Sequence, residues 1–235
     1  ASGAAIEAIL EALTYTNGSD DPAATRYLQV QLSDGDGGAF SAQTVVTITP
    51  EIDGLESLGE ETQANSYTNA DQSDSAIATL ADGSYVVVWH SNGQDGSNYG
   101  IFGQLYDASG VPAGPEFQVN STASNSQEYP AVVGLDTGGF AVAWTDQSGL
   151  NGNDNQREIV YRMYDANGAA TSGEIAVDAA DDYYPDSVSL TAFTDAVTGT
   201  FLISYTAYDS TTSQRKIAAQ VVNDAGGFVG AGFDI

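Results

Sequence analysis

The chain has 235 residues and a strongly acidic balance: 32 Asp and Glu against 5 Lys and Arg give a net charge of −27. We therefore expect no nucleic-acid partner, since binding phosphates requires a basic surface. Cysteine is absent, which excludes disulfides, thiolate metal sites and cysteine catalysis. No run of about 18 apolar residues occurs, so no membrane insertion is expected.

The excess of acid has two interpretations, and composition alone leaves both open. Carboxylate oxygens without counter-cations suit calcium, which takes six to eight oxygen ligands. A large negative charge also serves solubility alone. The 26 Gly and the many Asp residues favour turns over helices, so we expect β-structure with polar loops.

The first 50 residues differ in pattern from the rest of the chain. Apolar residues at helical spacing predict a short helix over Ala4–Leu13. Strands are expected over Arg26–Leu32 and Gln43–Thr49, with a glycine-rich turn at Ser33–Gly38 between them. Residues 51–60, which combine Gly and acids, are predicted to be a linker.

Residues 61–235 contain three copies of one pattern, at about 61–115, 116–173 and 174–235. In each copy an apolar run ends near a large aromatic residue: Trp89, Trp144 and Tyr205. A second shared segment begins at isoleucines that are 58 residues apart: Ile101, Ile159 and Ile217. Glu116–Asn120 matches Glu174–Asp178, and Glu61–Asn65 and Gly232–Ile235 fit the same pattern about one period before and after them. Such self-similarity indicates a repeat architecture.

Each copy is predicted to form four short strands. In the second copy these are Ala131–Asp136, Phe140–Asp146, Glu158–Asp165 and Glu174–Asp178. Four antiparallel strands in series are typical of β-propeller blades. The expected fold class is therefore all-β, with three propeller-like repeats; a β-sandwich or a solenoid is the alternative.

Two stretches resemble known sequences. LTYTNGSDDPAATRYLQVQLSDGDGG followed by AQTVVTITP resembles the second half of a cadherin-like domain, and DGSYVVVW…GIFGQLYDASG…EFQVN resembles the repeats beside such domains. Both occur in giant secreted bacterial adhesins of the RTX type. The resemblance implies that residues 1–50 are the C-terminal half of a cadherin-like sandwich. It also implies a secreted, cell-surface setting, calcium as a cofactor, and a longer polypeptide or other copies as partners.

Candidate calcium ligands lie in three kinds of loop. Asp34 and Asp36 are two residues apart on a glycine-rich turn, where carboxylates can converge on one cation. The other candidates are a pair before Pro22 and residues in equivalent loops of the first two repeats: Asp20, Asp21, Asp95, Asn153 and Asp154. An ordinary turn is the alternative interpretation at each place.

No catalytic motif is present. His90, the only histidine, has no nucleophile motif beside it, and the aromatic residues near the strand ends are expected in the core rather than as sugar platforms. Hydrolysis of a glycosidic bond needs only two carboxylates, which no motif would mark. The sequence therefore predicts a non-enzymatic extracellular adhesion module that assembles with neighbouring copies. A carbohydrate-binding propeller is the alternative, and a glycan-active enzyme fragment is a third hypothesis.

Overall fold

A computed structural model describes residues 25–33, 39–47, 61–150, 157–177, 182–193, 199–209 and 212–234. All regular structure in these residues is β-strand, and the contacts divide the chain into two units, residues 1–62 and 63–235. The described residues contain no helix that is long and apolar enough to cross a membrane.

The first unit contains one described hairpin. Strand β1 (Thr25–Ser33) pairs antiparallel with β2 (Ala39–Thr47), in a register that places Thr25 opposite Thr47. Both predicted strands are therefore present, although β2 begins and ends earlier than the sequence suggested. The predicted helix Ala4–Leu13 and the 51–60 linker lie outside the described residues. The assignment of residues 1–50 to half of a cadherin-like domain stays a prediction.

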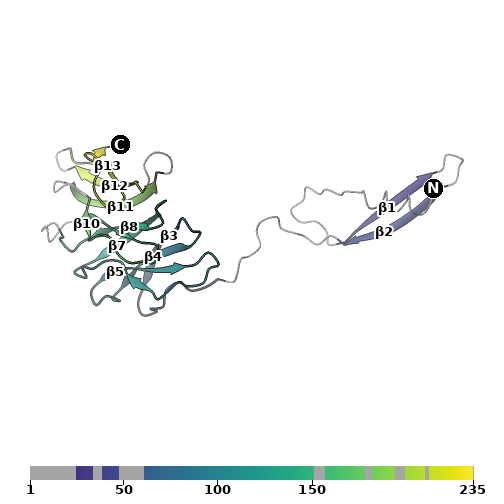
Figure 1. Ribbon diagram of the computed structural model, residues 1–235, viewed down its shortest axis with the longest axis horizontal. Helices are drawn as coiled ribbons and strands as arrows, with labels where there is room; N and C mark the ends of the chain where they lie inside the picture. The colour runs from purple at the N-terminus through teal and green to yellow at the C-terminus, as the bar shows by residue number, and fades with distance from the viewer. Residues whose placement is uncertain are drawn as a thin grey trace. The chain divides into compact units, whose positions relative to one another are not determined.

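The second unit is built from three four-stranded antiparallel sheets, one per repeat (Figure 1). Within each sheet the strands are neighbours in chain order, which is the arrangement expected for a blade. The first sheet contains β3 (Gln72–Thr79), β4 (Tyr85–Asn92), β5 (Tyr99–Tyr106) and β6 (Phe117–Gln118). The second contains β7 (Gln127–Gly134), β8 (Phe140–Asp146), β9 (Glu158–Tyr164) and β10 (Ile175–Ala176). The third contains β11 (Asp182–Ala192), β12 (Phe201–Asp209), β13 (Gln214–Val222) and β14 (Phe233–Asp234).

The three sheets are copies of one unit, as the repeats predicted. Trp89, Trp144 and Tyr205 occupy the same place on the second strand, and their exposed fractions are only 3%, 0% and 6%. The segments leading into the first two sheets also match. Asn65 donates from Nδ2 to Gln72 at 2.9 Å, and Asn120 donates in the same way to Gln127 at 3.0 Å.

Hydrophobic side chains fill the space between successive sheets. Here the side of a sheet that faces the preceding repeat is its leading face, and the opposite side is its trailing face. One core cluster joins the trailing face of the first sheet to the leading face of the second, and another joins the second to the third. The leading residues of β8 and β12 are Phe140, Val142 and Trp144, and Phe201, Ile203 and Tyr205. Both faces of β8 and β9 in the second sheet are thus buried, which explains the continuous apolar run of β8.

The first strands of neighbouring sheets approach each other very closely. A Cβ atom on Gly134, at the end of β7, would lie 2.1 Å from the carbonyl oxygen of Thr79 at the end of β3. Only glycine fits that space, because the backbone oxygen cannot turn away as a flexible side chain could. The two first strands therefore converge at this end.

The described residues therefore form an all-β, propeller-like fold, as predicted. The two core clusters run from the first sheet to the second and from the second to the third. Among the described residues, no core cluster joins the third sheet back to the first, so the stack is open at both ends.

Candidate functional site

A bulge interrupts the first strand of all three sheets at the same place. The pairing register shifts between Ser73 and Ala76 in β3, between Glu128 and Ala131 in β7, and around Asp186 in β11. The residues within the bulges have left-handed backbones: Asp74 (φ 52°), Tyr129 (φ 57°) and Ser187 (φ 56°). Non-glycine residues rarely adopt this conformation. Threefold repetition makes the bulge a feature of the blade, whereas the side chains that it presents differ from sheet to sheet.

His90 of β4 lies at the centre of a polar cluster between the first two bulges. Its Nε2 atom is 2.7 Å from Ser73 Oγ and 3.3 Å from Asp74 Oδ2. On the opposite side of the ring, the backbone N–H of Tyr129 donates to Nδ1 at 3.3 Å. The imidazole is thus held by residues of its own sheet and of the second sheet, and only 5% of the side chain is exposed.

This geometry determines which nitrogen carries the proton. Because Tyr129 N–H points at Nδ1, that atom must accept, and the proton of a neutral ring is then on Nε2. His90 therefore donates to Ser73 or Asp74. Ser73 consequently has no base that could take its proton, and the Ser, His and Asp side chains do not form a nucleophilic triad.

The electrostatic setting also favours the neutral ring. Burial lowers the pKa of His90, although the carboxylates of Asp74 and Glu128 act on it in the opposite direction. Desolvation is the larger effect because the ring is enclosed between two sheets. The cluster thus contains a neutral hydrogen-bonding ring flanked by two carboxyl groups.

Two tyrosine rings complete the cluster. The Tyr99 centroid lies 4.7 Å from that of His90, and the Tyr129 ring meets His90 edge-on at 5.8 Å. Tyr129 is 41% exposed, so its ring lies partly at the surface. Beside it, Gln147 donates from Nε2 to Glu128 at 2.8 Å. We call the set Ser73, Asp74, His90, Tyr99, Glu128 and Tyr129 the bulge cluster.

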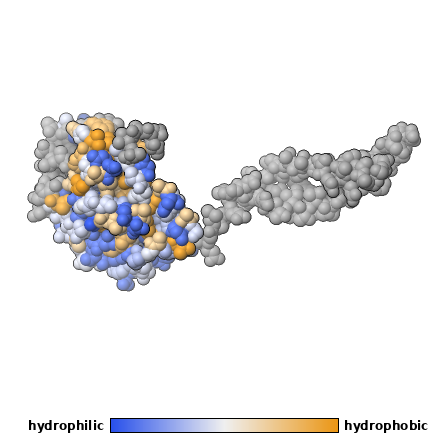
Figure 2. Space-filling view, viewed as in Figure 1, coloured by the Kyte–Doolittle hydropathy of each residue, from blue (hydrophilic) through white to orange (hydrophobic). Residues whose placement is uncertain are grey.

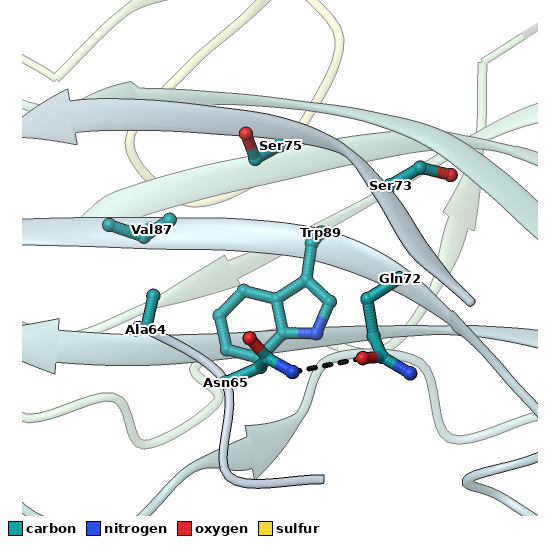
Figure 3. Close-up of a pocket in the computed structure, with 7 residues that line it drawn as sticks. All are labelled: Ala64, Asn65, Gln72, Ser73, Ser75, Val87 and Trp89. Atoms are coloured by element: carbon teal, nitrogen blue, oxygen red, sulfur yellow. Dashed lines mark hydrogen bonds between the residues drawn. The ribbon is translucent and has the colours of Figure 1, made fainter. Parts of the chain in front are cut away.

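A second feature is a cavity of about 240 Å³ on the leading face of the first sheet. Figure 3 shows the indole of Trp89 beside the amide pair of Asn65 and Gln72; the other lining residues are Ala64, Ser73, Ser75 and Val87. In the second sheet the corresponding position is filled, since Trp144 lies in the core cluster under the first sheet. The cavity is therefore the uncovered counterpart of a contact between sheets.

Most of the predicted calcium ligands lie outside the described residues. Of these seven residues only Asp95 is described; the others lie outside the described residues: Asp20, Asp21, Asp34, Asp36, Asn153 and Asp154. Asp95 accepts the backbone N–H of Ser97 at 3.0 Å, and its other oxygen is 3.5 Å from Asn120 Nδ2. Within the described part of the chain, no three acidic or histidine side chains gather as a metal site. Calcium stays a prediction.

The sequence reasoning considered His90 but missed its neighbours. No motif includes Ser73, Asp74, Glu128 or Tyr129. A left-handed backbone is often marked in a sequence by glycine, but these positions are occupied by Asp74 and Tyr129. Aligning the first strands of the repeats would have placed Asp74 beside Tyr129 and Ser187. That alignment was obscured because the interval between the first bulges is 55 residues and between the next two 58.

Comparison with known proteins gives a structural likeness only. No family model matches the chain, and no curated protein matches it. Among solved structures, a point mutant of the alpha-L-arabinanase of Cellvibrio cellulosa is 15% identical with a TM-score of 0.39, covering 91% of this chain and 74% of that one. The same organism's alpha-L-arabinanase complexed with arabinohexaose is 11% identical with a TM-score of 0.28, covering 88% and 92%.

These matches correct one prediction. The sequence was interpreted as non-enzymatic, but both matching structures are named as enzymes, which contradicts that interpretation. The error lay in treating a missing motif as evidence, since carboxylates that act on sugars need no sequence motif. Adhesion is not confirmed either.

Proposed function

We propose that the chain is a carbohydrate-recognition module and that the bulge cluster binds the sugar. The observation that carries the proposal is the partly exposed ring of Tyr129, fixed beside hydrogen-bonding groups from two sheets. A sugar ring offers an apolar face and a rim of hydroxyls. An aromatic platform next to carboxylate and hydroxyl groups complements both.

The rigidity of the cluster supports this function. The Tyr129 backbone donates to His90, which in turn donates to Ser73 or Asp74, so the polar groups are held in position before any ligand arrives. Preorganised groups lose little conformational entropy on binding. Asp74, whose side chain is 49% exposed, and Glu128 provide acceptors for sugar hydroxyls.

The test is a glycan array followed by calorimetry on the glycans that bind. The variant Tyr129→Asn removes the ring yet suits the left-handed backbone, since Asn tolerates that conformation. We expect at least a tenfold loss of affinity with an unchanged melting temperature. The control Phe228→Ala removes another ring of similar exposure, 45%, away from the cluster. Equal affinity of Tyr129→Asn and the wild type would contradict the proposal.

Glycan hydrolysis is a second candidate, favoured by one observation: Asp74 lies 3.3 Å from His90 Nε2, and the carboxylates of Asp74 and Glu128 both act to raise the pKa of that imidazole. Two carboxyl groups are what glycoside hydrolysis requires. Hydrolysis would be supported if the wild type releases reducing ends from polysaccharides and both Asp74→Asn and Glu128→Gln abolish that release. Binding without release would leave recognition alone.

The wider setting is part of the same proposal. A secreted, cell-surface location within a large bacterial adhesin follows from the sequence resemblance described above. In that setting the first unit would serve as a spacer, and the repeats would present the sugar site.

A further inference from the structure

The leading face of the first sheet is the one leading face that no described sheet covers. It contains Ile77, Tyr85, Val87, Trp89 and Tyr106. Ile77 is 65% exposed, whereas Trp89 and Tyr106 are only 3% and 6% exposed, because they meet Ala64 and Asn65 of the segment that leads into the sheet. The matching residues of the second sheet pack against the first sheet in the shared core: Val132, Phe140, Val142, Trp144 and Tyr164. The same side of the repeat is thus a packing surface wherever its neighbour is present.

Unpaired polar atoms mark the same face. In the described part of the chain, the buried Trp89 Nε1 and Ser91 Oγ have no hydrogen-bond partner. Trp89 is 97% buried yet borders the cavity shown in Figure 3. The equivalent Trp144 donates to Asp146 at 3.1 Å, and Asp146 stands where the first sheet has Ser91. A buried donor without a partner costs stability, so the cavity lacks a group that would accept from it.

An aromatic pair on this face also lacks its third member. Tyr85 and Tyr106 stack with centroids 4.9 Å apart and planes at 7°, as Phe140 and Tyr164 do in the second sheet. In the second sheet Phe117, from the outer strand of the first sheet, completes the group at 6.4 and 5.9 Å. Among the described residues no third ring meets Tyr85 and Tyr106.

The trailing face of the third sheet supplies the complementary features. Ile217 stands where the other sheets have Ile101 and Ile159, which are fully buried, yet Ile217 is 43% exposed. Phe233 stands where the first sheet has Phe117, and it is 48% exposed. Apolar surface is evident over the third sheet in Figure 2. This face also presents hydroxyl groups, Ser204 and Thr206, which can accept from an indole N–H.

We propose that the leading face of the first sheet binds the trailing face of the third sheet of a second copy of this chain. The junction would continue the two sheet-to-sheet interfaces already present within the chain. In it the partner's Phe233 would complete the ring group of Tyr85 and Tyr106. The two faces are different, so the contact is heterologous: it closes into a ring or extends into a filament. This inference is independent of sugar binding.

Charge sets the conditions for association. The face residues Ile77, Tyr85, Val87, Trp89 and Tyr106 are uncharged, whereas each chain carries −27 overall. Long-range repulsion between copies is screened by salt, but contact between apolar faces is not weakened by it. Association should therefore strengthen as NaCl rises from about 20 to 500 mM, a range over which the Debye length falls steeply.

The experiment measures the mass of the full chain by sedimentation equilibrium at micromolar concentration. Ile77→Glu spoils the leading face, and Ile217→Glu spoils the trailing face. Each variant alone should be a monomer of 24.3 kDa. Mixed together they retain one intact junction, so they should form a one-to-one dimer and nothing larger. Val111→Glu, a substitution at a 57% exposed turn residue outside both faces, should associate like the wild type.

Each outcome decides the matter, provided that circular dichroism shows every variant to be folded. A wild type that stays monomeric in high salt would overturn the proposal. That result is expected, for example, if another part of the chain covers the leading face. Single variants that still associate, or a mixture that stays monomeric, would also overturn it. Restored dimers in the mixture alone would support a head-to-tail junction.

Discussion

His90 contacts two partly exposed residues of the bulge cluster. The carboxylate of Asp74 approaches its Nε2 atom, and the ring of Tyr129 meets the imidazole edge-on. Its hydrogen bonds require a neutral ring, because a second ring proton would point at the Tyr129 N–H. Protonation of the ring and folding of the cluster are therefore opposed.

This opposition predicts a pH dependence of stability. The folded pKa of His90 lies below its unfolded value, so the unfolded chain binds the proton first as pH falls. The contribution of the neutral His90 ring to the free energy of unfolding is complete above about pH 6.5, the ordinary pKa of histidine. It is lost as pH falls from there through the folded pKa. His90→Gln cannot titrate, so its urea unfolding free energy should fall less than that of the wild type between pH 8 and 5. Parallel curves for the two proteins would contradict the assignment.

At the scale of the strands, β7 approaches β3 of the preceding sheet closely at Gly134. A methyl group there would meet the Thr79 carbonyl, so Gly134→Ala must push two backbones apart. We expect a loss of roughly 1–3 kcal/mol in the free energy of unfolding, typical of overpacking. Gly173→Ala is the matched control, since a Cβ there has no atom within 4 Å and no unusual φ is required. Equal stability of the two variants would show that the strands can separate freely.

The strands could be predicted from the sequence, but the bulges could not. Trp89, Trp144 and Tyr205 occupy equivalent positions because each copy repeats the same apolar run. The strand β8 spans the predicted residues, Phe140–Asp146. By contrast, β7 begins at Gln127, before the predicted Ala131, because the bulge at Tyr129 interrupts the alternation. The bulge cluster depends on contacts across two sheets, for example from Tyr129 to His90, 39 residues apart. Local patterns carry no information about such contacts.

At the scale of the whole molecule, the excess of negative charge makes ions part of its stability. Any cation screens repulsion among 32 carboxylates, whereas bound calcium would act through particular ligands. The sequence prediction places the first site at Asp34 and Asp36. A ligand that binds only the folded state stabilises it by about 2.7 kcal/mol at one hundred times its Kd.

Calcium should therefore raise the melting temperature beyond the effect of ionic strength. The measurement compares melting curves in chelator, in millimolar CaCl₂, and in MgCl₂ or NaCl at matched ionic strength. Screening alone would shift all salts alike, because the Debye length depends only on ionic strength. Specific binding would give a larger shift with calcium, and Asp34→Asn combined with Asp36→Asn would remove that excess while leaving the NaCl response intact. If calcium gives no more than matched magnesium in the wild type, the acid excess serves solubility, and the predicted calcium sites are wrong.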